Sequence, residues 1–95
     1  MDRIVLHVYY SGENGKAAAF AKEMISGGLQ KMVYSEEGCL QYEYYTPLDD
    51  TDKILLLEAW RDEECIRRHQ NSENMKKIKE MKAKFGLETV IERYE

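Results

Sequence analysis

Four consecutive apolar residues, Ile-Leu-Leu-Leu at positions 54–57, lie inside a strand-like segment that runs from residue 53 to residue 60. Successive side chains of a strand point to opposite faces of its sheet, so a strand with one wet face carries polar residues at alternate positions. This run has none, and both faces of the strand therefore need to be covered. Any fold for the chain has to supply two covering layers at this strand.

Three further segments are predicted to be strands, at residues 4–10, 39–46 and 87–94. They are rich in β-branched and aromatic residues, and turn-forming residues follow the first two. A short turn rich in Asp, with one Pro, residues 47–52, leads from the second of these segments to the strand at residues 53–60. A connection of this kind favours an antiparallel hairpin between the two strands.

Apolar residues at three- and four-residue spacing predict helices between the strands. One helix is expected over residues 16–34, with a bend where Gly27 and Gly28 interrupt it. Its apolar face consists of Ala17, Phe20, Ala21, Met24, Ile25, Leu29, Met32 and Val33. Asp62 and Ser72 are expected to cap two more helices, and Gly86 to end the second of them. The apolar stripe of that last helix is Met75, Ile78, Met81, Lys82 and Phe85.

The order of elements, strand, helix, strand, strand, helix pair, strand, indicates a ferredoxin-like α+β fold (βαββααβ) in a single domain over residues 1–95. Such a fold has a four-stranded antiparallel sheet with helices on one face. The helices cover only one side of the apolar strand at residues 53–60, so its other side needs a different cover. A second copy packed sheet to sheet is the simplest solution, and we expect a homodimer.

The charge of the chain bears on its partners. The formal net charge of −4 is spread along the sequence, which argues against nucleic acid as a partner. The densest basic stretch is interleaved with Glu73 and Glu80 and is interpreted as a solvent-exposed helix face. It consists of Lys76, Lys77, Lys79, Lys82 and Lys84.

Cys39 and Cys65 are too few and too widely spaced for a disulfide framework or a zinc knuckle. We expect them to be buried reduced thiols, and we expect no metal site. No apolar run approaches the roughly 20 residues of a membrane span, and the first strand is too short and too polar for a signal peptide. The sequence therefore predicts a cytoplasmic protein with no membrane partner.

The junction between the strand at residues 53–60 and the following helix gathers the residues best suited to chemistry. Glu58 and Trp60 share one strand face by alternation, and His69 follows nine residues after Trp60. A carboxylate, an aromatic surface and an imidazole, whose unperturbed pKa is about 6.5, would meet here. Structural roles compete with this interpretation, because Trp60 can serve as a packing anchor and His69 can bond to backbone or to Glu58.

Two tyrosines and the second histidine are further candidates. Tyr42 and Tyr44 are predicted to share a face with Leu40, where core packing competes with stacking on a planar substrate. His7 shares a strand face with Tyr9, where a structural or interface role competes with contact to a substrate.

Gly38-Cys-Leu-Gln-Tyr42, Leu57-Glu-Ala-Trp-Arg-Asp-Glu-Glu64 and Arg68-His69, in this order of elements, resemble antibiotic biosynthesis monooxygenase domains. Relatives in that family include quinol monooxygenases, an isomerase acting on phosphorylated autoinducer-2, and haem-degrading enzymes. The resemblance implies a dimeric α/β barrel in which each protomer holds a pocket between its sheet and its helices. Two features depart from the family. Many relatives carry a second His where this chain has Asn74, and haem degraders use an Asn on strand one, where this chain offers His7.

The resemblance implies a cofactor-independent monooxygenase that acts on a small quinol or phenol with molecular oxygen, without a flavin or other cofactor. His69 would act as the base, with Trp60 and Glu58 as its catalytic neighbours. Substrate contacts would come from His7, Tyr42, Tyr44 and Asn74. The alternatives are an isomerase or other proton-transfer enzyme on a small carbonyl compound, and a non-catalytic small-molecule-binding module. Haem degradation is the least favoured alternative.

Overall fold

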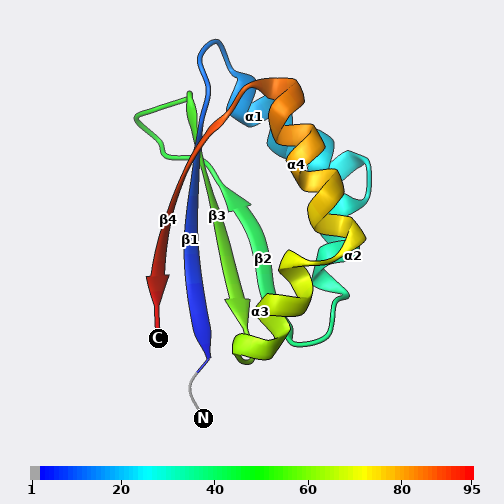
Figure 1. Ribbon diagram of the computed structural model, residues 1–95. Helices are drawn as coiled ribbons and strands as arrows, with labels where there is room; N and C mark the ends of the chain where they lie inside the picture. The colour runs from blue at the N-terminus through cyan, green and yellow to red at the C-terminus, as the bar shows by residue number, and fades with distance from the viewer. Residues whose placement is uncertain (1–2) are drawn as a thin grey trace.

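Strands and helices follow one another in the ferredoxin-like order in this computed structural model, which describes residues 3–95. The elements are β1 (Ile4–Ser11), α1 (Lys16–Ser26), α2 (Leu29–Tyr34), β2 (Cys39–Tyr45), β3 (Lys53–Trp60), α3 (Glu63–Gln70), α4 (Glu73–Phe85) and β4 (Glu88–Tyr94) (Figure 1). The predicted α+β fold class is confirmed, and the bounds of β3 are those expected from the sequence.

The four strands form one antiparallel sheet in the order β2-β3-β1-β4, with β3 and β1 at its centre. The antiparallel pairing of β2 with β3, expected from the short turn between them, is confirmed. The register places Tyr42 opposite Glu58, and Glu58 opposite Leu6 on the other side of β3. These three side chains therefore point to the same face of the sheet.

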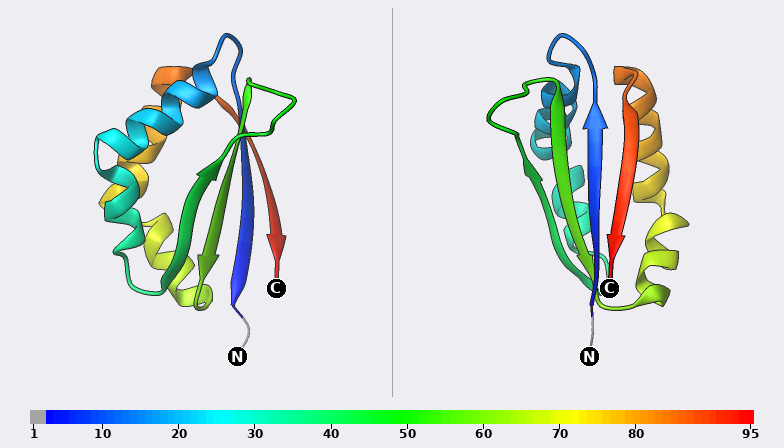
Figure 2. Two further views of the ribbon diagram at one scale, coloured as in Figure 1. Left: turned by 180° about the vertical axis from the view of Figure 1, so that it is seen from behind. Right: turned by 90° about the vertical axis from the view of Figure 1, so that its left-hand side faces the viewer.

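All four helices lie against that face, as Figure 1 shows, and the other face of the sheet carries no helix. The right-hand view of Figure 2 looks onto this second face, with the helices behind the strands. We call it the uncovered sheet face; by register it includes Val5, His7, Tyr9, Gln41, Glu43, Tyr45, Leu55, Leu57, Ala59, Val90, Glu92 and Tyr94. Leu55 and Leu57 are only half-buried there, whereas Ile54 and Leu56 on the helix side are buried.

A β-bulge alters the predicted pattern of β2. The register shifts between Cys39 and Gln41, so that Leu40 is left outside the regular alternation. Leu40 is 44% exposed, while Tyr42 on the helix side is 2% exposed. The prediction that Leu40 shares a face with Tyr42 and Tyr44 is therefore wrong, because the bulge consumes one residue; Cys39 packs against the core in its place.

The helix expected over residues 16–34 is in fact two helices, α1 and α2. Gly28 has φ +84°, a left-handed conformation that an α-helix cannot contain, so the chain breaks here instead of bending. The continuous apolar stripe is interrupted at the break, and Ile25 and Met32, both predicted to face the core, are 49% and 47% exposed. The other six residues of the predicted face are buried.

The predicted ends of α3 and α4 are confirmed. The Asp62 carboxylate accepts a hydrogen bond from the backbone N–H of Cys65 at 3.0 Å, and Ser72 Oγ accepts one from Met75 N–H at 3.1 Å. Gly86, with φ +64°, ends α4. Over the described residues, no helix combines the length and the apolar character that crossing a bilayer requires.

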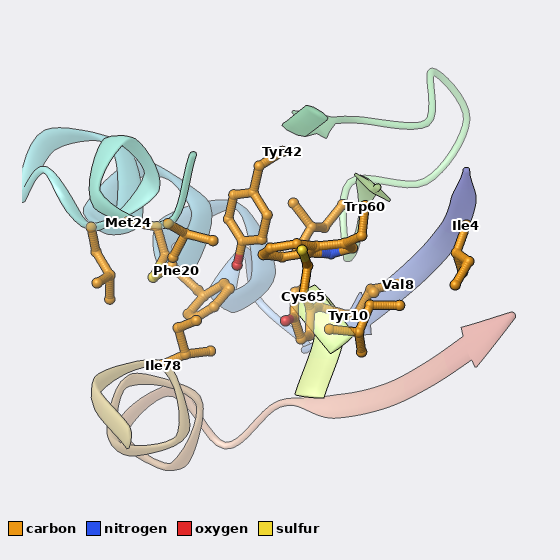
Figure 3. Close-up of a cluster of buried hydrophobic side chains, with 13 residues drawn as sticks. Ile4, Val8, Tyr10, Phe20, Met24, Tyr42, Trp60, Cys65 and Ile78 are labelled. Carbon is orange, nitrogen blue, oxygen red and sulfur yellow. The ribbon is translucent and has the colours of Figure 1, made fainter. Parts of the chain in front are cut away.

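The hydrophobic core lies between the sheet and the helices. Figure 3 shows its buried side chains, with Trp60 among residues from the sheet, α1 and the later helices. Trp60, Phe20, Met24 and Leu56 are fully buried. The cavity described next lies beside this core, between the sheet and helices α3 and α4.

Candidate functional site

A cavity of about 410 Å³ lies between the sheet and helices α3 and α4. Strands β1, β2, β3 and β4 form one wall, and residues from the two helices form the other. Most of its lining is apolar, from residues such as Val8, Ile66, Met75 and Ile78. Volume and lining are those of a small-molecule site, for which about 300–1,000 Å³ is usual. The polar groups that reach this cavity therefore decide what it can bind.

His69 lines the cavity from the last turn of α3 and is 3% exposed. Its Nδ1 lies 2.9 Å and 3.1 Å from the two carboxylate oxygens of Glu36, in the loop between α2 and β2. Asn74 Nδ2 donates a hydrogen bond of 2.8 Å to the same carboxylate. A carboxylate oxygen accepts hydrogen bonds, so Nδ1 is the donor in this pair, and the tautomer with the proton on Nδ1 leaves Nε2 as an acceptor. Nε2 has no hydrogen-bond partner among residues 3–95.

Trp60 forms the surface on which the His69 ring rests. The two ring centroids are 4.7 Å apart with an interplanar angle of 30°, a stacked arrangement. The Trp60 indole N–H donates a hydrogen bond of 2.9 Å to Glu58 Oε1. Trp60 is fully buried and does not itself line the cavity. Of the two roles that the sequence left open for Trp60, packing anchor and pocket wall, the structure shows the packing role, with the His69 ring stacked on the indole.

Glu58 lines the cavity from β3 and is 7% exposed. Burial raises the pKa of this carboxyl above its ordinary value, although the Trp60 N–H bond and the nearby His69 act in the opposite direction. The sequence left His69 free to pair with Glu58 or with backbone; the structure pairs His69 with Glu36 and Glu58 with Trp60. Two carboxyl groups in different surroundings therefore flank one imidazole.

Two tyrosines, Tyr42 from β2 and Tyr10 from β1, also line the cavity. Burial raises the pKa of both hydroxyls well above the usual range, so both stay protonated and available as donors. The Tyr42 ring stands edge-on to His69, with centroids 6.3 Å apart. Tyr44 does not line the cavity; its hydroxyl is buried without a hydrogen-bond partner among the described residues.

The remaining two candidates lie elsewhere. His7 lies on the uncovered sheet face with Tyr9, as the sequence predicts, and its ring centroid is 4.7 Å from that of Tyr94. Asn74 touches Glu36, so it reaches the site through the carboxylate that holds His69. The structure therefore brings His69, Glu58 and Tyr42 to the cavity, Trp60 and Asn74 to the groups around it, and His7 to the opposite side of the sheet.

The residues of the site that were not identified from the sequence include Tyr10, Glu36, Lys79 and Lys82. No pattern in the sequence distinguishes Glu36 as a site residue, because it lies in a polar loop next to a second glutamate, Glu37. Lys82 did carry a signal, since it interrupts an otherwise apolar helix stripe. The interpretation of the lysines as a solvent-exposed face agrees with the exposure of Lys79 and is wrong only for Lys82, which is half-buried. Both of these lysines nevertheless line the cavity. In residues 3–95, His, Cys, Asp and Glu side chains form no group of three or more that could hold a metal ion.

Both cysteines are free thiols, Cys65 buried and Cys39 half-buried. Burial raises the pKa of Cys39 to about 12, and burial also raises the pKa of Cys65. Neither lines the cavity. Thiols held in the protonated form are poor nucleophiles, which leaves the chemistry of the cavity to its imidazole, carboxyl and hydroxyl groups.

Solved structures share the fold. A conserved protein of unknown function from Bacteroides thetaiotaomicron VPI-5482, described as a possible oxidoreductase, superposes with a TM-score of 0.84 at 17% identity, over 97% of this chain and 95% of that one. A "putative antibiotic biosynthesis monooxygenase" from Deinococcus radiodurans gives 0.83 at 18% identity, over 97% and 90%. A conserved protein from Methanosarcina mazei Go1 gives 0.82 at 26% identity, again over 97% and 90%.

Among curated proteins, none matches the chain closely enough to count as a relative. The family model for antibiotic biosynthesis monooxygenase, in contrast, matches residues 3–81. The match extends from β1 into α4 and includes Glu36, Glu58, Trp60, His69 and Asn74. The chain therefore belongs to the antibiotic biosynthesis monooxygenase family.

Proposed function

We propose that the protein is a cofactor-independent monooxygenase that oxidises a small quinol or phenol. The observation that carries this proposal is the His69 ring itself. It lies at an apolar cavity, stacked on Trp60, with Nδ1 held by Glu36 and Nε2 left without a partner among residues 3–95. A fixed imidazole with a free acceptor nitrogen is suited to removing a proton from a bound hydroxyl group.

Proton removal is the step at which a protein can assist such a reaction. Molecular oxygen reacts slowly with closed-shell compounds unless they give up an electron readily, and a hydroquinone anion is a far better donor than the neutral molecule. His69 Nε2 would take the proton, and the Glu36 carboxylate would stabilise the imidazolium that forms. The hydroxyls of Tyr10 and Tyr42, kept protonated by burial, would donate to the substrate oxygens.

The overall reaction balances without another reductant. One oxygen atom of O₂ enters a ring C–H bond of the hydroquinone and gives a hydroxyquinone. The second oxygen atom leaves as water, with the two hydroxyl hydrogens of the hydroquinone. Glu58, bonded to the indole on which His69 stacks, would act as a positioning residue for the base.

Oxygen consumption with a panel of small hydroquinones tests the proposal. Replacing His69 by Ala should lower the rate by about 10²- to 10⁴-fold, as loss of a general base does. Added imidazole should restore part of the activity, which separates loss of the base from loss of the fold. Unchanged oxygen consumption in His69→Ala would remove His69 from the base role, and no consumption by the unaltered protein with any hydroquinone would overturn the monooxygenase.

A second candidate is an isomerase or other proton-transfer enzyme on a small carbonyl compound. The observation that favours it is the pair Glu58 and His69, two titratable groups in different surroundings that line one cavity. Such a pair can remove a proton at one atom and return it at another. Deuterium incorporation into a small hydroxy-ketone in D₂O under anaerobic conditions would favour this candidate over the monooxygenase.

We further propose that the protein acts as a homodimer that buries the uncovered sheet face. This face carries Leu55 and Leu57 at the centre of the sheet and Tyr94, 48% exposed, at its edge. Apolar side chains over the width of a sheet favour a partner of similar shape, and a second copy presents one. Gel filtration at the mass of a single chain, 11.2 kDa, would contradict the dimer.

A further inference from the structure

Helix α4 presents one face to the cavity, and that face changes character along its length. The cavity-lining residues Met75, Ile78, Lys79 and Lys82 follow the i, i+3, i+4, i+7 spacing of a single helix face. The first two are apolar and the last two carry positive charge. A face that packs only against a core would be apolar throughout, so the two lysines call for a separate explanation.

The two lysines lie at the open side of the cavity. Lys79 is exposed and Lys82 is half-buried, whereas Glu58 and His69 farther inside are buried. In residues 3–95, neither lysine has a carboxylate oxygen within 4.0 Å, whereas Lys84, farther along the same helix, pairs with Glu23 at 3.2 Å. Lys82 Nζ lies 5.5 Å from the centre of the Tyr10 ring, which is itself part of the cavity wall.

The open side of the cavity, which we call its mouth, is positively charged, whereas the chain as a whole is negatively charged. The protein has a formal net charge of −4, yet Glu58 is the only acidic residue among those that line the cavity. Burial, and then the neighbouring charge of Lys79, lower the pKa of Lys82. Two like charges one helical turn apart repel each other, and an anion placed between them would relieve this repulsion.

We propose that Lys79 and Lys82 form an anion-binding subsite at the cavity mouth, and that the substrate is an aromatic compound that carries a carboxylate. This inference rests on the proposed function, because it takes the cavity to be the site of an aromatic hydroxyl compound. The ring occupies the apolar interior with its hydroxyl toward His69, and the carboxylate lies between the two ammonium groups. Two separate single charges, without an arginine or a cluster of backbone N–H groups, suit a singly charged anion.

Binding of two probes that share one ring system tests the subsite without turnover. These are 6-hydroxy-2-naphthoate and 2-naphthol, which differ in the carboxylate alone; in the first, the hydroxyl and the carboxylate lie at opposite ends of the ring system. Calorimetric titration under anaerobic conditions should show about tenfold tighter binding of the naphthoate, as expected for charge-assisted contacts that are partly shielded from water. The preference should shrink as salt is added. Equal affinity for the two probes, or no binding of either, would overturn the proposal.

Two double variants test which lysines cause the tighter binding of the naphthoate. Lys79→Gln/Lys82→Gln should abolish it and leave the affinity for 2-naphthol within about twofold, because the apolar interior is unaltered. Lys76→Gln/Lys77→Gln is the matched control: it removes the same charge from the same helix at residues that do not line the cavity, and it should keep the preference. Loss of the preference in the control alone, or its survival in Lys79→Gln/Lys82→Gln, would overturn the subsite.

Failure of the subsite and failure of the proposed function give different results. If neutral hydroquinones support oxygen consumption while the two probes bind equally, the monooxygenase stands and the subsite is overturned. If the naphthoate binds more tightly through Lys79 and Lys82 while no hydroquinone supports oxygen consumption, the subsite stands and the reaction is a different one.

Discussion

The two faces of the sheet are built from the same four strands and differ in what covers them. On the helix side, polar groups near the cavity have defined partners: His69 with Glu36, Glu58 with Trp60, and Asn74 with Glu36. On the uncovered sheet face, half-buried and exposed apolar and aromatic side chains carry no covering layer. The helix side has the ordered polar groups that chemistry needs, and the other side has the apolar area that association needs.

The two histidines of the chain show the same contrast. His69 is held at one ring nitrogen by a carboxylate and rests on a fully buried indole. His7 contacts the rings of Tyr9 and Tyr94 on the uncovered sheet face. The histidine between the sheet and the helices thus has a carboxylate partner, whereas the histidine on the uncovered sheet face has only aromatic neighbours. The predictions below test whether the two faces are as separate as their contacts indicate.

The largest effect is expected at Leu56, which lies on the helix side and is fully buried. Leu56→Ala should lower the free energy of unfolding by about 2–5 kcal/mol, because a cavity is left in a packed core. Urea denaturation followed by circular dichroism measures this loss. The loss should be similar at low and high protein concentration, since Leu56 does not contribute to the face that we expect to associate.

Its neighbour Leu57, on the uncovered sheet face, should behave differently. Leu57→Lys places a charge on the face that we propose is buried between two copies, so that the dimer would bring two like charges together. Gel filtration should shift from twice 11.2 kDa to 11.2 kDa, while far-ultraviolet circular dichroism stays unchanged. A variant that still elutes as a dimer would show that the copies associate through another surface.

Much of this fold could be predicted because it depends on local signals. Alternation, helical spacing and the caps at Asp62 and Ser72 each act within a few residues, and the structure agrees with them. The failures have physical causes that such patterns do not carry. A bulge removed Leu40 from its predicted face, and the left-handed conformation of Gly28 broke one expected helix into two.

The candidate site was only partly predictable, because its partners are distant in sequence. Glu58 and Trp60 are two residues apart on a strand, so their shared face follows from alternation. Glu36 lies 33 residues before His69, and only the folded chain brings the two together. Tyr10 likewise reaches the cavity from β1 at the sheet centre, and nothing near it in the sequence indicates this.

A smaller effect is expected on the helix side from Glu36→Gln. The amide can still accept the hydrogen bond from His69 Nδ1, but it no longer supplies the negative charge that stabilises an imidazolium. On the proposed function, kcat for quinol oxidation should fall about tenfold while KM changes little, since the substrate does not touch Glu36. A rise in KM with kcat unchanged would assign Glu36 a role in binding instead.

The adjacent Glu37 supplies the matched control for this variant. Glu37 is exposed and pairs with Arg61 and Arg68 at 3.2 Å and 2.7 Å, outside the cavity. Glu37→Gln removes the same charge one residue away, and it should leave kcat within about twofold, as surface substitutions do. Equal losses in Glu36→Gln and Glu37→Gln would mean that the loop as a whole, and not the carboxylate at His69, limits the reaction.

The smallest effects concern how stability depends on pH, and they should have opposite signs on the two faces. Burial raises the pKa of Glu58 above its ordinary value of 4.5. Its contribution to stability is therefore fully present below that pH and is lost as the pH rises through the raised pKa. Glu58→Gln keeps an acceptor for the Trp60 N–H and cannot ionise, so its stability relative to the unaltered protein should rise over this range.

Glu43, on the uncovered sheet face, should show the reverse. Hydrogen bonds from Gln41 and Tyr45 lower the pKa of this exposed carboxyl, so its contribution is present above the ordinary value of 4.5 and is lost as the pH falls through the lowered pKa. Melting temperatures of Glu58→Gln, Glu43→Gln and the unaltered protein, measured between about pH 3 and pH 8, compare the two. If the stability difference from the unaltered protein changes with pH in the same direction for both variants, the opposite pKa shifts of Glu58 and Glu43 are contradicted.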